Sequence, residues 1–306
     1  MALAILMPGR DTTKLVRQLK QIEPDIDVRV WPDIGDEADI VYAILWKHPP
    51  GALSGFPNLG TVSSFGAGVD FILADPDLPA GVTVTRVVDD KLIHDMMLYT
   101  VSVVLERKRC LMAYRDLQNQ GQWKPLPEAD IETIGILGLG HIGGRMARGF
   151  ADLGFRVLGW DRQSKKVDGV ETFASHQMDD MLGQADCLIC CLPLTDETRG
   201  ILNADLFGKM KRGAFLINVA RGGHLKEEDL IAVLDSGHLS GACLDVFSQE
   251  PLPADHPFWT HPKITITPHI AGITDPESAV RQLHENYRRT QSGQPLLNPV
   301  DRNLGF

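Results

Sequence analysis

The chain has 306 residues, of which 43% are hydrophobic and 23% are charged, and its formal net charge is −10 at pH 7. This length is enough for two globular domains, and the acidic balance argues against nucleic acid or an anionic membrane as a partner. No apolar run approaches the roughly 20 residues that span a bilayer, and the N-terminal MALAILMPG lacks the basic segment of a signal peptide. We therefore expect a cytoplasmic protein.

Strand and helix patterns alternate over the first part of the chain. The strand candidates are LAILMP, VRVWP, IVYAILW and TVSSF, and KLVRQLKQI is a helix candidate between the first two. One long helix is then expected over roughly 91–119, ended by GQWKPLPEADIE. Its buried face is formed by residues that recur at helical spacing: Ile93, Met97, Val101, Val104 and Leu111.

From residue 131 onward the pattern of strand, turn and helix repeats. The apolar runs are ETIGIL, RVLGW, CLICCL, AFLINV, ACLDVF and ITIT, and stretches such as KEEDLIAVLDSG end in glycine, as helices do. A last amphipathic helix is expected in DPESAVRQLHENYRRTQSG. This alternation predicts an α/β fold of two Rossmann-like, doubly wound domains, each with a parallel sheet.

The motif CLICC could be taken for a metal or redox site. It lies within an apolar run that is typical of a doubly buried strand. Neighbouring strand residues point to opposite faces, so Cys187, Cys190 and Cys191 cannot converge on one ion. We expect structural cysteines and no metal.

The segment IETIGILGLGHIGGRMARGF places Gly138, Gly140 and Gly143 between a strand and a helix. In this context the glycines allow a tight turn, the approach of a pyrophosphate, and close packing of helix on strand. Asp161 ends the next strand, where an acid commonly holds the adenine ribose. A nicotinamide dinucleotide is the expected cofactor.

The preference between NAD and NADP stays open on the residues alone. Asp161 would bind a free 2′-hydroxyl and repel a 2′-phosphate, which favours NAD. A polar, cationic cluster that could accommodate the 2′-phosphate follows at once; it comprises Arg162, Ser164, Lys165 and Lys166.

Three charged or titratable residues follow later strands: Arg221 after FLINVA, Glu250 after ACLDVF, and His269 after ITITP. In a doubly wound sheet, ligands lie beyond the carboxyl ends of the strands, where the glycine loop also lies. Arginine can hold a carboxylate or carbonyl, and a histidine beside a glutamate can donate a proton. This set predicts reduction of a 2-keto acid, with His269 as general acid.

The segments INVARGGHLKEEDLIAVLDSGHLSGACLDVFSQEPLP, ITPHIAG, FGAGVD and WKPLPE, with the glycine loop, resemble the D-isomer-specific 2-hydroxyacid dehydrogenases. The resemblance covers nearly the whole chain and is greatest to the glyoxylate/hydroxypyruvate reductase A type. It implies that Arg221 binds and polarises the keto acid, that His269 is the acid/base, and that Glu250 pairs with it.

The resemblance also implies binding roles for other residues. Asp245 would bond the nicotinamide carboxamide, while Trp46, Lys47, Ala67 and Gly68 would contact substrate. Further cofactor contacts are predicted at His141, Ile142, Leu192, Pro193, Thr198, Val219 and Ala220. Members of the reductase A type carry a serine at the position of Asp161 and prefer NADPH, so this difference also leaves the preference open.

A discontinuous domain organisation is implied as well. Residues 1–95 and 273–306 would form a smaller, flavodoxin-like lid or substrate domain, and residues 96–272 would form the dinucleotide-binding domain. A helical arm would make a homodimer, and closure of the lid would exclude water from the hydride path.

Two other classes of protein are compatible with the cofactor loop. A formate or phosphite dehydrogenase of the same superfamily is less favoured, because the Glu250–His269 pair with a glycine-rich carboxylate turn suits a keto acid. A dinucleotide-sensing corepressor would bind cofactor with negligible turnover, and such proteins carry additional partner-binding segments.

Overall fold

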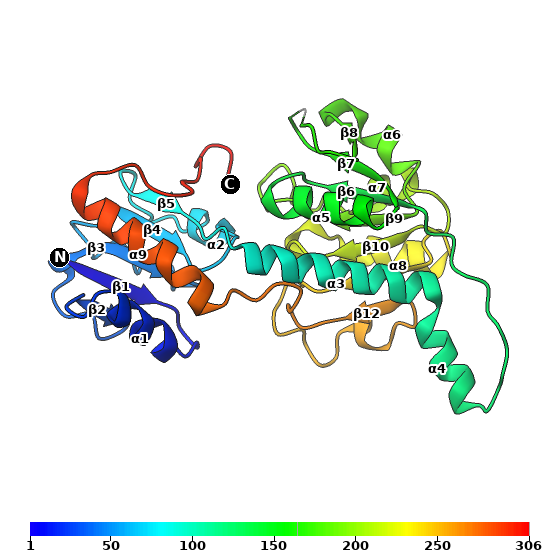
Figure 1. The fold of residues 1–306 in the computed structure, drawn as a ribbon, viewed down its shortest axis with the longest axis horizontal. Coiled ribbons are helices and arrows are strands. Elements are labelled where there is room, and N and C mark those ends of the chain that lie inside the picture. Colours follow the sequence, from blue (N-terminus) through cyan, green and yellow to red (C-terminus); the bar gives the residue numbers. More distant parts are fainter. Residues whose placement is uncertain (164, 306) are drawn as a thin grey trace. The chain divides into compact units, whose positions relative to one another are not determined.

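The computed structural model describes residues 1–163 and 165–305, so Ser164 of the predicted cationic cluster lies outside the described residues. The chain forms two compact units (Figure 1). The first comprises Met1–Leu92 and the C-terminal segment from Thr274, and the second comprises Ile93–Ile273. Both are α/β structures with parallel sheets, which confirms the predicted fold class.

The first unit is built on a five-stranded sheet in the order β2-β1-β3-β4-β5. The strands are β1 (Ala2–Leu6), β2 (Val28–Val30), β3 (Ile40–Leu45), β4 (Thr61–Ser64) and β5 (Thr83–Thr85). The helices are α1 (Thr13–Ile22), the short α2 (Asp70–Leu73) and α9 (Pro276–Ser292). Strand β5 was not predicted; it has only three residues and lies at the edge of the sheet.

Both faces of this sheet are buried. Leu3 and Ile5 pack into one apolar cluster with residues of α1 and α9, whereas Ala4 and Leu6 pack into a second cluster on the opposite face. This division follows from the alternation of side chains along a strand. It explains why LAIL reads as a continuous apolar run.

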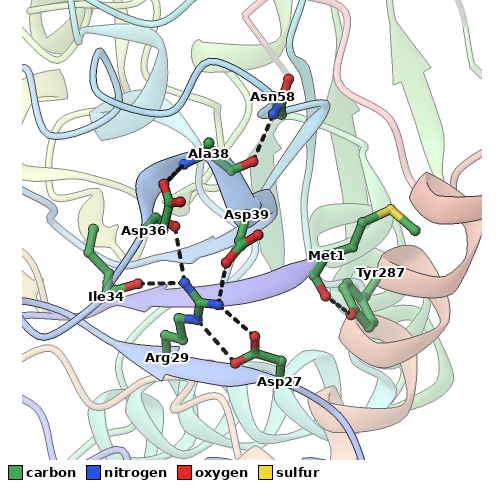
Figure 2. Close-up of polar contacts among 9 residues, drawn as sticks. All are labelled: Met1, Asp27, Arg29, Ile34, Asp36, Ala38, Asp39, Asn58 and Tyr287. Atoms are coloured by element: carbon green, nitrogen blue, oxygen red, sulfur yellow. Dashed lines mark hydrogen bonds and ion pairs between the residues drawn. The ribbon is translucent and has the colours of Figure 1, made fainter.

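Polar contacts fasten a loop and a helix of the first unit to its sheet (Figure 2). Nη2 of Arg29 lies 2.8 Å from the Asp27 carboxylate and 2.7 Å from that of Asp39, and Nη1 donates to the Ile34 carbonyl at 3.0 Å. One guanidinium thus orders the connection between β2 and β3. The Tyr287 hydroxyl donates to the Met1 carbonyl at 3.0 Å, which fastens α9 to the start of β1.

The second unit has a seven-stranded sheet in the order β12-β11-β10-β9-β6-β7-β8. The strands are β6 (Thr133–Leu137), β7 (Arg156–Trp160), β8 (Glu171–Phe173), β9 (Cys187–Cys190), β10 (Phe215–Asn218), β11 (Gly241–Leu244) and β12 (Ile264–Ile266). The order reverses between β6 and β9, which is the point where doubly wound sheets bind ligands. The short edge strand β8 was not predicted.

Helices cover both faces of the second sheet. The helices on one face are α6 (Met178–Leu182), α7 (Ala204–Lys209) and α8 (Glu227–Asp235), whose apolar residues join one cluster with alternate strand residues. On the other face, α5 (His141–Asp152) packs against β6 and β7, and Tyr99 of α3 (Asp90–Arg109) reaches Cys243 of β11.

The expected single helix over 91–119 is two helices, α3 and α4 (Leu111–Asn119), so that prediction was wrong at residue 110 (Figure 1). Cys110 has a φ of +55°, a left-handed conformation that ends a right-handed helix. Ile93 and Val104 are buried as expected, but Leu111 is 58% exposed. Because the helix changes direction at Cys110, the buried face does not continue into α4.

The cysteines of CLICC follow the strand prediction. Cys187 and Cys190 begin and end β9, are fully buried and are free thiols. Burial raises the pKa of the Cys190 thiol to about 12, so the thiol stays protonated at neutral pH. Across the described residues, no helix is both long enough and apolar enough to cross a membrane.

Candidate active site

The glycine loop follows β6 and leads directly into α5. Gly138 has a φ of +93°, and a Cβ at this position would lie 3.0 Å from the Cys191 carbonyl oxygen. A side chain on Gly143 would overlap the Gly138 carbonyl. At Gly140, by contrast, no described atom lies within 4 Å of the position of a Cβ. Two glycines therefore pack the loop tightly, and the third leaves space open beside it.

This open space lies at the N-terminus of α5. Gly140 is the residue that caps the helix, and His141, Ile142 and Gly143 form its first turn. The backbone N–H groups of a first helical turn have no partner within the helix, and the helix dipole is positive there. Together these features suit the pyrophosphate of a dinucleotide.

Asp161 directly follows β7, and its carboxylate is engaged by three donors. Oδ2 accepts from the Leu139 backbone N–H at 2.9 Å and from Lys165 Nζ at 2.7 Å, and Oδ1 accepts from the Gln163 N–H at 3.1 Å. Burial alone would raise the pKa of Asp161, but these hydrogen bonds outweigh it and hold the pKa below its usual value. The carboxylate thus fastens the glycine loop as an anion.

The neighbouring cations are also in contact with polar groups. Lys165 Nζ lies 3.3 Å from the Leu139 carbonyl, so it bridges Asp161 and the loop. Arg162 forms an ion pair with Glu197 at 3.0 Å, and Lys166 is exposed. A bound 2′-phosphate would therefore meet cations that are partly neutralised by carboxylates.

Two catalytic candidates and the predicted cofactor residue Asp245 follow three adjacent strands whose ends lie in register. Asn218 of β10 pairs with Leu244 of β11, which pairs with Ile266 of β12. Arg221, Asp245 and His269 follow these strand ends by one to three residues. Parallel pairing therefore brings all three to the carboxyl edge of the sheet, as does the glycine loop after β6.

The loop that carries Arg221 depends on close backbone packing. A side chain on Gly222 would overlap the backbone of Phe247, so only glycine lets this loop lie against the segment that leads to Glu250. Asn218 is buried, and its amide Nδ2 donates to the Arg221 carbonyl at 3.0 Å. His224 is also buried, with Nδ1 at 3.0 Å from the same carbonyl.

His269 and Glu250 form a direct pair. The Nδ1 atom of His269 lies 3.0 Å and 3.1 Å from the two carboxylate oxygens of Glu250. The two side chains are 31% and 21% exposed, so the pair is shielded but remains accessible. Because Nδ1 faces Glu250, Nε2 is the ring nitrogen that remains to exchange a proton with a ligand.

The backbone at His269 is in the left-handed region, with a φ of +55°. Its N–H donates to the Asp245 carbonyl at 2.8 Å. The Asp245 carboxylate is buried and accepts from the N–H groups of Ile270 and Ala271, each at 2.9 Å. The turn that carries His269 is therefore built around Asp245, a contact that the sequence did not predict.

The other predicted cofactor residues lie at the same sheet edge. Leu192 and Pro193 follow β9, and Val219 and Ala220 follow β10. The Thr198 hydroxyl donates to the Pro193 carbonyl at 2.6 Å, so it orders the loop after β9. His224 Nε2 lies 3.2 Å from that same carbonyl. His224 and Asn218 were missed, because nothing in the sequence marks residues that act through backbone carbonyls.

Four of the five predicted substrate residues lie in the first unit, and the fifth, Arg221, lies in the second. Trp46 and Lys47 follow β3; the Arg10 guanidinium lies 4.3 Å from the centre of the Trp46 ring, and Lys47 has a φ of +46°. Ala67 and Gly68 follow β4, where the Ser64 hydroxyl donates to the Gly68 carbonyl at 2.6 Å. Both pairs thus lie at carboxyl ends of adjacent strands of the five-stranded sheet.

One protein-family model matches more than half of the chain. Residues 101–271 match the model described as D-isomer specific 2-hydroxyacid dehydrogenase, NAD binding domain. The matched segment contains the glycine loop, Arg221, Glu250 and His269.

Two related proteins match nearly the whole chain. The glyoxylate/hydroxypyruvate reductase A of Serratia proteamaculans is 43% identical over 296 residues, which are 94% of each chain. That of Photorhabdus laumondii is 40% identical and covers 98% of each.

Solved structures have the same fold. A D-isomer specific 2-hydroxyacid dehydrogenase from Xanthobacter autotrophicus, in complex with NADPH and MES, superposes with a TM-score of 0.93 at 38% identity. The superposition covers 100% of this chain and 99% of the Xanthobacter chain. An NADPH-dependent glyoxylate/hydroxypyruvate reductase from Sinorhizobium meliloti, with NADP and sulfate, has a TM-score of 0.92 at 36% identity and the same coverage.

Proposed function

Because the chain belongs to the D-isomer specific 2-hydroxyacid dehydrogenase family, we propose that it reduces small 2-keto acids with NAD(P)H. Glyoxylate and hydroxypyruvate are the proposed substrates, and the products are the 2-hydroxy acids. The observation that carries the proposal is the His269–Glu250 pair at the same sheet edge as Arg221 and the glycine loop. The names of the relatives support the substrate class.

In this proposal the cofactor supplies the hydride, and the protein supplies charge and a proton. Arg221 binds the keto acid through its planar guanidinium and polarises the carbonyl. The Glu250 carboxylate accepts a hydrogen bond from Nδ1–H of His269 and stabilises the imidazolium. His269 then donates its Nε2 proton to the carbonyl oxygen as negative charge develops there.

The residues that would hold the dinucleotide follow from the loop geometry. The first turn of α5, with Gly138, Gly140 and Gly143, would bind the pyrophosphate, and Asp161 would lie at the adenine ribose. The loops after β9 and β10 would contact the rest of the cofactor, and Asp245 its carboxamide. Residues 96–272 would be the binding domain, and residues 1–95 with 273–306 would supply Trp46, Lys47, Ala67 and Gly68 to the substrate.

We further propose that both NADH and NADPH bind. Lys165 neutralises the Asp161 carboxylate, which lessens its repulsion of a 2′-phosphate. Arg162 is a second cation beside it, although Glu197 offsets its charge. Solved relatives from Xanthobacter autotrophicus and Sinorhizobium meliloti contain NADPH or NADP, which supports use of the phosphorylated form.

We also propose that the protein forms a homodimer and that it is cytoplasmic. Helix α4 and the segment after it expose large apolar side chains: Leu111 at 58%, Met112 at 66% and Trp123 at 102%. Such a surface is typical of a protein interface. The five free cysteines suit a reducing compartment.

The proposal is tested by assaying a panel of 2-keto acids with NADH and NADPH in parallel. We expect turnover of glyoxylate and hydroxypyruvate above that of bulkier acids. Cofactor binding with negligible reduction of every acid would instead indicate a dinucleotide-sensing protein. Oxidation of formate or phosphite in place of keto-acid reduction would assign the chain to that other class.

A further inference from the structure

A series of buried and partly buried polar groups is hydrogen-bonded to the turn that carries His269. It runs from Cys243 of β11 through Tyr99 of α3 to Thr267, which follows β12, and ends on the Asp245 carboxylate. The Tyr99 hydroxyl lies 3.3 Å from Cys243 Sγ and 2.6 Å from Thr267 Oγ1, and Thr267 Oγ1 lies 2.5 Å from Asp245 Oδ1. Tyr99 and Thr267 are 168 residues apart in the chain, so the fold alone brings them together.

The direction of each hydrogen bond follows from the chemistry of the groups. The Asp245 oxygens accept from the N–H groups of Ile270 and Ala271, so the carboxylate acts as an acceptor on both oxygens. Thr267 must then donate its single hydroxyl proton to Asp245, and Thr267 Oγ1 accepts from Tyr99. Burial raises the pKa of Tyr99, so its hydroxyl keeps the proton that it donates.

This series of hydrogen bonds matters because His269 has a left-handed backbone conformation. A φ of +55° is uncommon for a residue other than glycine, although histidine adopts it more often than most, and it is held here by neighbouring contacts. The contacts that impose it converge on Asp245. Its carbonyl accepts from the His269 N–H, and its carboxylate accepts from the next two N–H groups.

Of the groups around the Asp245 carboxylate, the Thr267 hydroxyl is the side-chain donor. Rotation of the carboxylate would break the bonds to Ile270 and Ala271 and release the turn. The Thr267 hydroxyl, itself oriented by Tyr99, opposes that rotation. The orientation of the imidazole toward Glu250 therefore depends on two hydroxyls that touch neither residue of the pair.

We propose that Tyr99 and Thr267 are positioning residues for His269, acting through Asp245. The inference rests on the proposed role of His269 as the proton donor. It adds two residues, neither of which was among the predicted site residues. Loss of either hydroxyl should loosen the turn and weaken the contact between His269 and Glu250.

The test compares Tyr99→Phe and Thr267→Val with the wild-type enzyme in keto-acid reduction. Each change removes a hydroxyl at nearly constant volume. We expect kcat to fall about three- to tenfold, which corresponds to the loss of one partly buried hydrogen bond. Thr267→Ser keeps the hydroxyl and should restore kcat.

The pH profile separates positioning from a general loss of structure. Reduction requires His269 to donate a proton, so activity is lost on the alkaline side of the pH profile. A weaker contact with Glu250 stabilises the imidazolium less, and the alkaline limb should move to lower pH in both variants. Because the hydroxyls act in series, the double variant should be no worse than the worse single one.

Thr100→Val is the matched control. Thr100 is a buried threonine on the same helix, and its hydroxyl donates to the carbonyls of Met96 and Met97. This variant should keep the wild-type kcat and pH profile. Wild-type kcat in Tyr99→Phe and Thr267→Val would overturn the inference, as would a lower kcat with an unmoved alkaline limb. Failure of the proposed role of His269 is distinguished by His269→Gln, which would then keep full activity, and failure of the proposed function by a wild-type protein that reduces no 2-keto acid.

Discussion

Each unit contains a histidine paired with a carboxylate, and the two pairs differ in their surroundings. In the first unit, His48 Nε2 lies 2.9 Å from Asp75, and the side chains are 1% and 2% exposed. In the second, His269 Nδ1 lies 3.0 Å from Glu250, and the side chains are 31% and 21% exposed. The distances are nearly equal, so the distance alone cannot distinguish a structural pair from a catalytic one.

The surroundings decide the role of each pair. Asp75 also accepts from the N–H groups of Gly51 and Asp77, and so it orders two loops. His48 Nδ1 is buried and has no hydrogen-bond partner among the described atoms, so it has no route to exchange a proton. His269 keeps an accessible ring and lies on the sheet edge that carries Arg221. Exposure and neighbours, rather than the pair itself, indicate chemistry.

The largest expected effect separates the two histidines directly. His269→Gln should lower kcat by about 100- to 10,000-fold, because the proposed general acid is lost, while NAD(P)H binding measured by fluorescence stays unchanged. His48→Gln should leave kcat within a few-fold and instead lower the melting temperature. Retained turnover in His269→Gln would remove it from the acid/base role.

The second prediction concerns Arg221, the arginine at the sheet edge of the His269–Glu250 pair. Arg221→Ala should lower kcat/KM for 2-keto acids about 100-fold, because the substrate carboxylate loses a bidentate partner. Arg212→Ala is the control, since Arg212 is an exposed arginine at the opposite end of the same strand. An unchanged kcat/KM in Arg221→Ala would contradict its assignment to the site.

The third prediction concerns pH and stability. Burial would raise the pKa of Asp75, but hydrogen bonds from Asp77, His48 and Gly51 outweigh it and hold the pKa below its usual value. A carboxyl with a lowered pKa stabilises the fold above its unfolded pKa of about 3.9, and this stability is lost as pH falls through the folded pKa.

Asp75→Asn should therefore lower the free energy of unfolding at pH 7 by about 1–3 kcal/mol and reduce the loss of stability below about pH 4. Chemical denaturation at pH 7, 5 and 3 measures both effects. Glu250→Gln is the matched variant, and it should change kcat far more than stability. Equal stability of Asp75→Asn and wild type at every pH would show that the first pair does not stabilise the fold.

The smallest effect is expected at a third paired carboxylate, Asp161 with Lys165. Asp161→Ser removes the negative charge and should raise the ratio of NADPH to NADH affinity several-fold. Lys165→Ala leaves Asp161 without its cation and should lower the same ratio. Kd values measured by cofactor fluorescence test both, and ratios that stay at the wild-type value would place neither residue at the ribose.

Much of the second unit was predictable because its signals are local. Gly138 has a positive φ and lies close to the Cys191 backbone, Gly143 lies against the Gly138 carbonyl, and Gly140 leaves open space beside the loop. Parallel strands necessarily share a carboxyl edge, so the alternation of strands and helices was enough to place Arg221 and His269 together.

The failures have an equally physical cause. The break at Cys110 separates two stretches of good helical pattern, and local propensity does not mark it. Strands β5 and β8 have three residues each, too few for a periodic pattern. The hydrogen bonds of Asp161 with Lys165 and with the Leu139 N–H depend on the orientation of the Asp161 side chain, which the sequence does not show.

The sequence by itself determined the fold class, the glycine loop and the strand-end positions of Arg221, Glu250 and His269. These follow from periodicity and chain geometry over a few residues. Only the tertiary structure decided what lies beside them: Asp245 under the His269 turn, and the hydroxyls of Tyr99 and Thr267 behind it. Such contacts join residues far apart in the chain, and they depend on packing that no local pattern encodes.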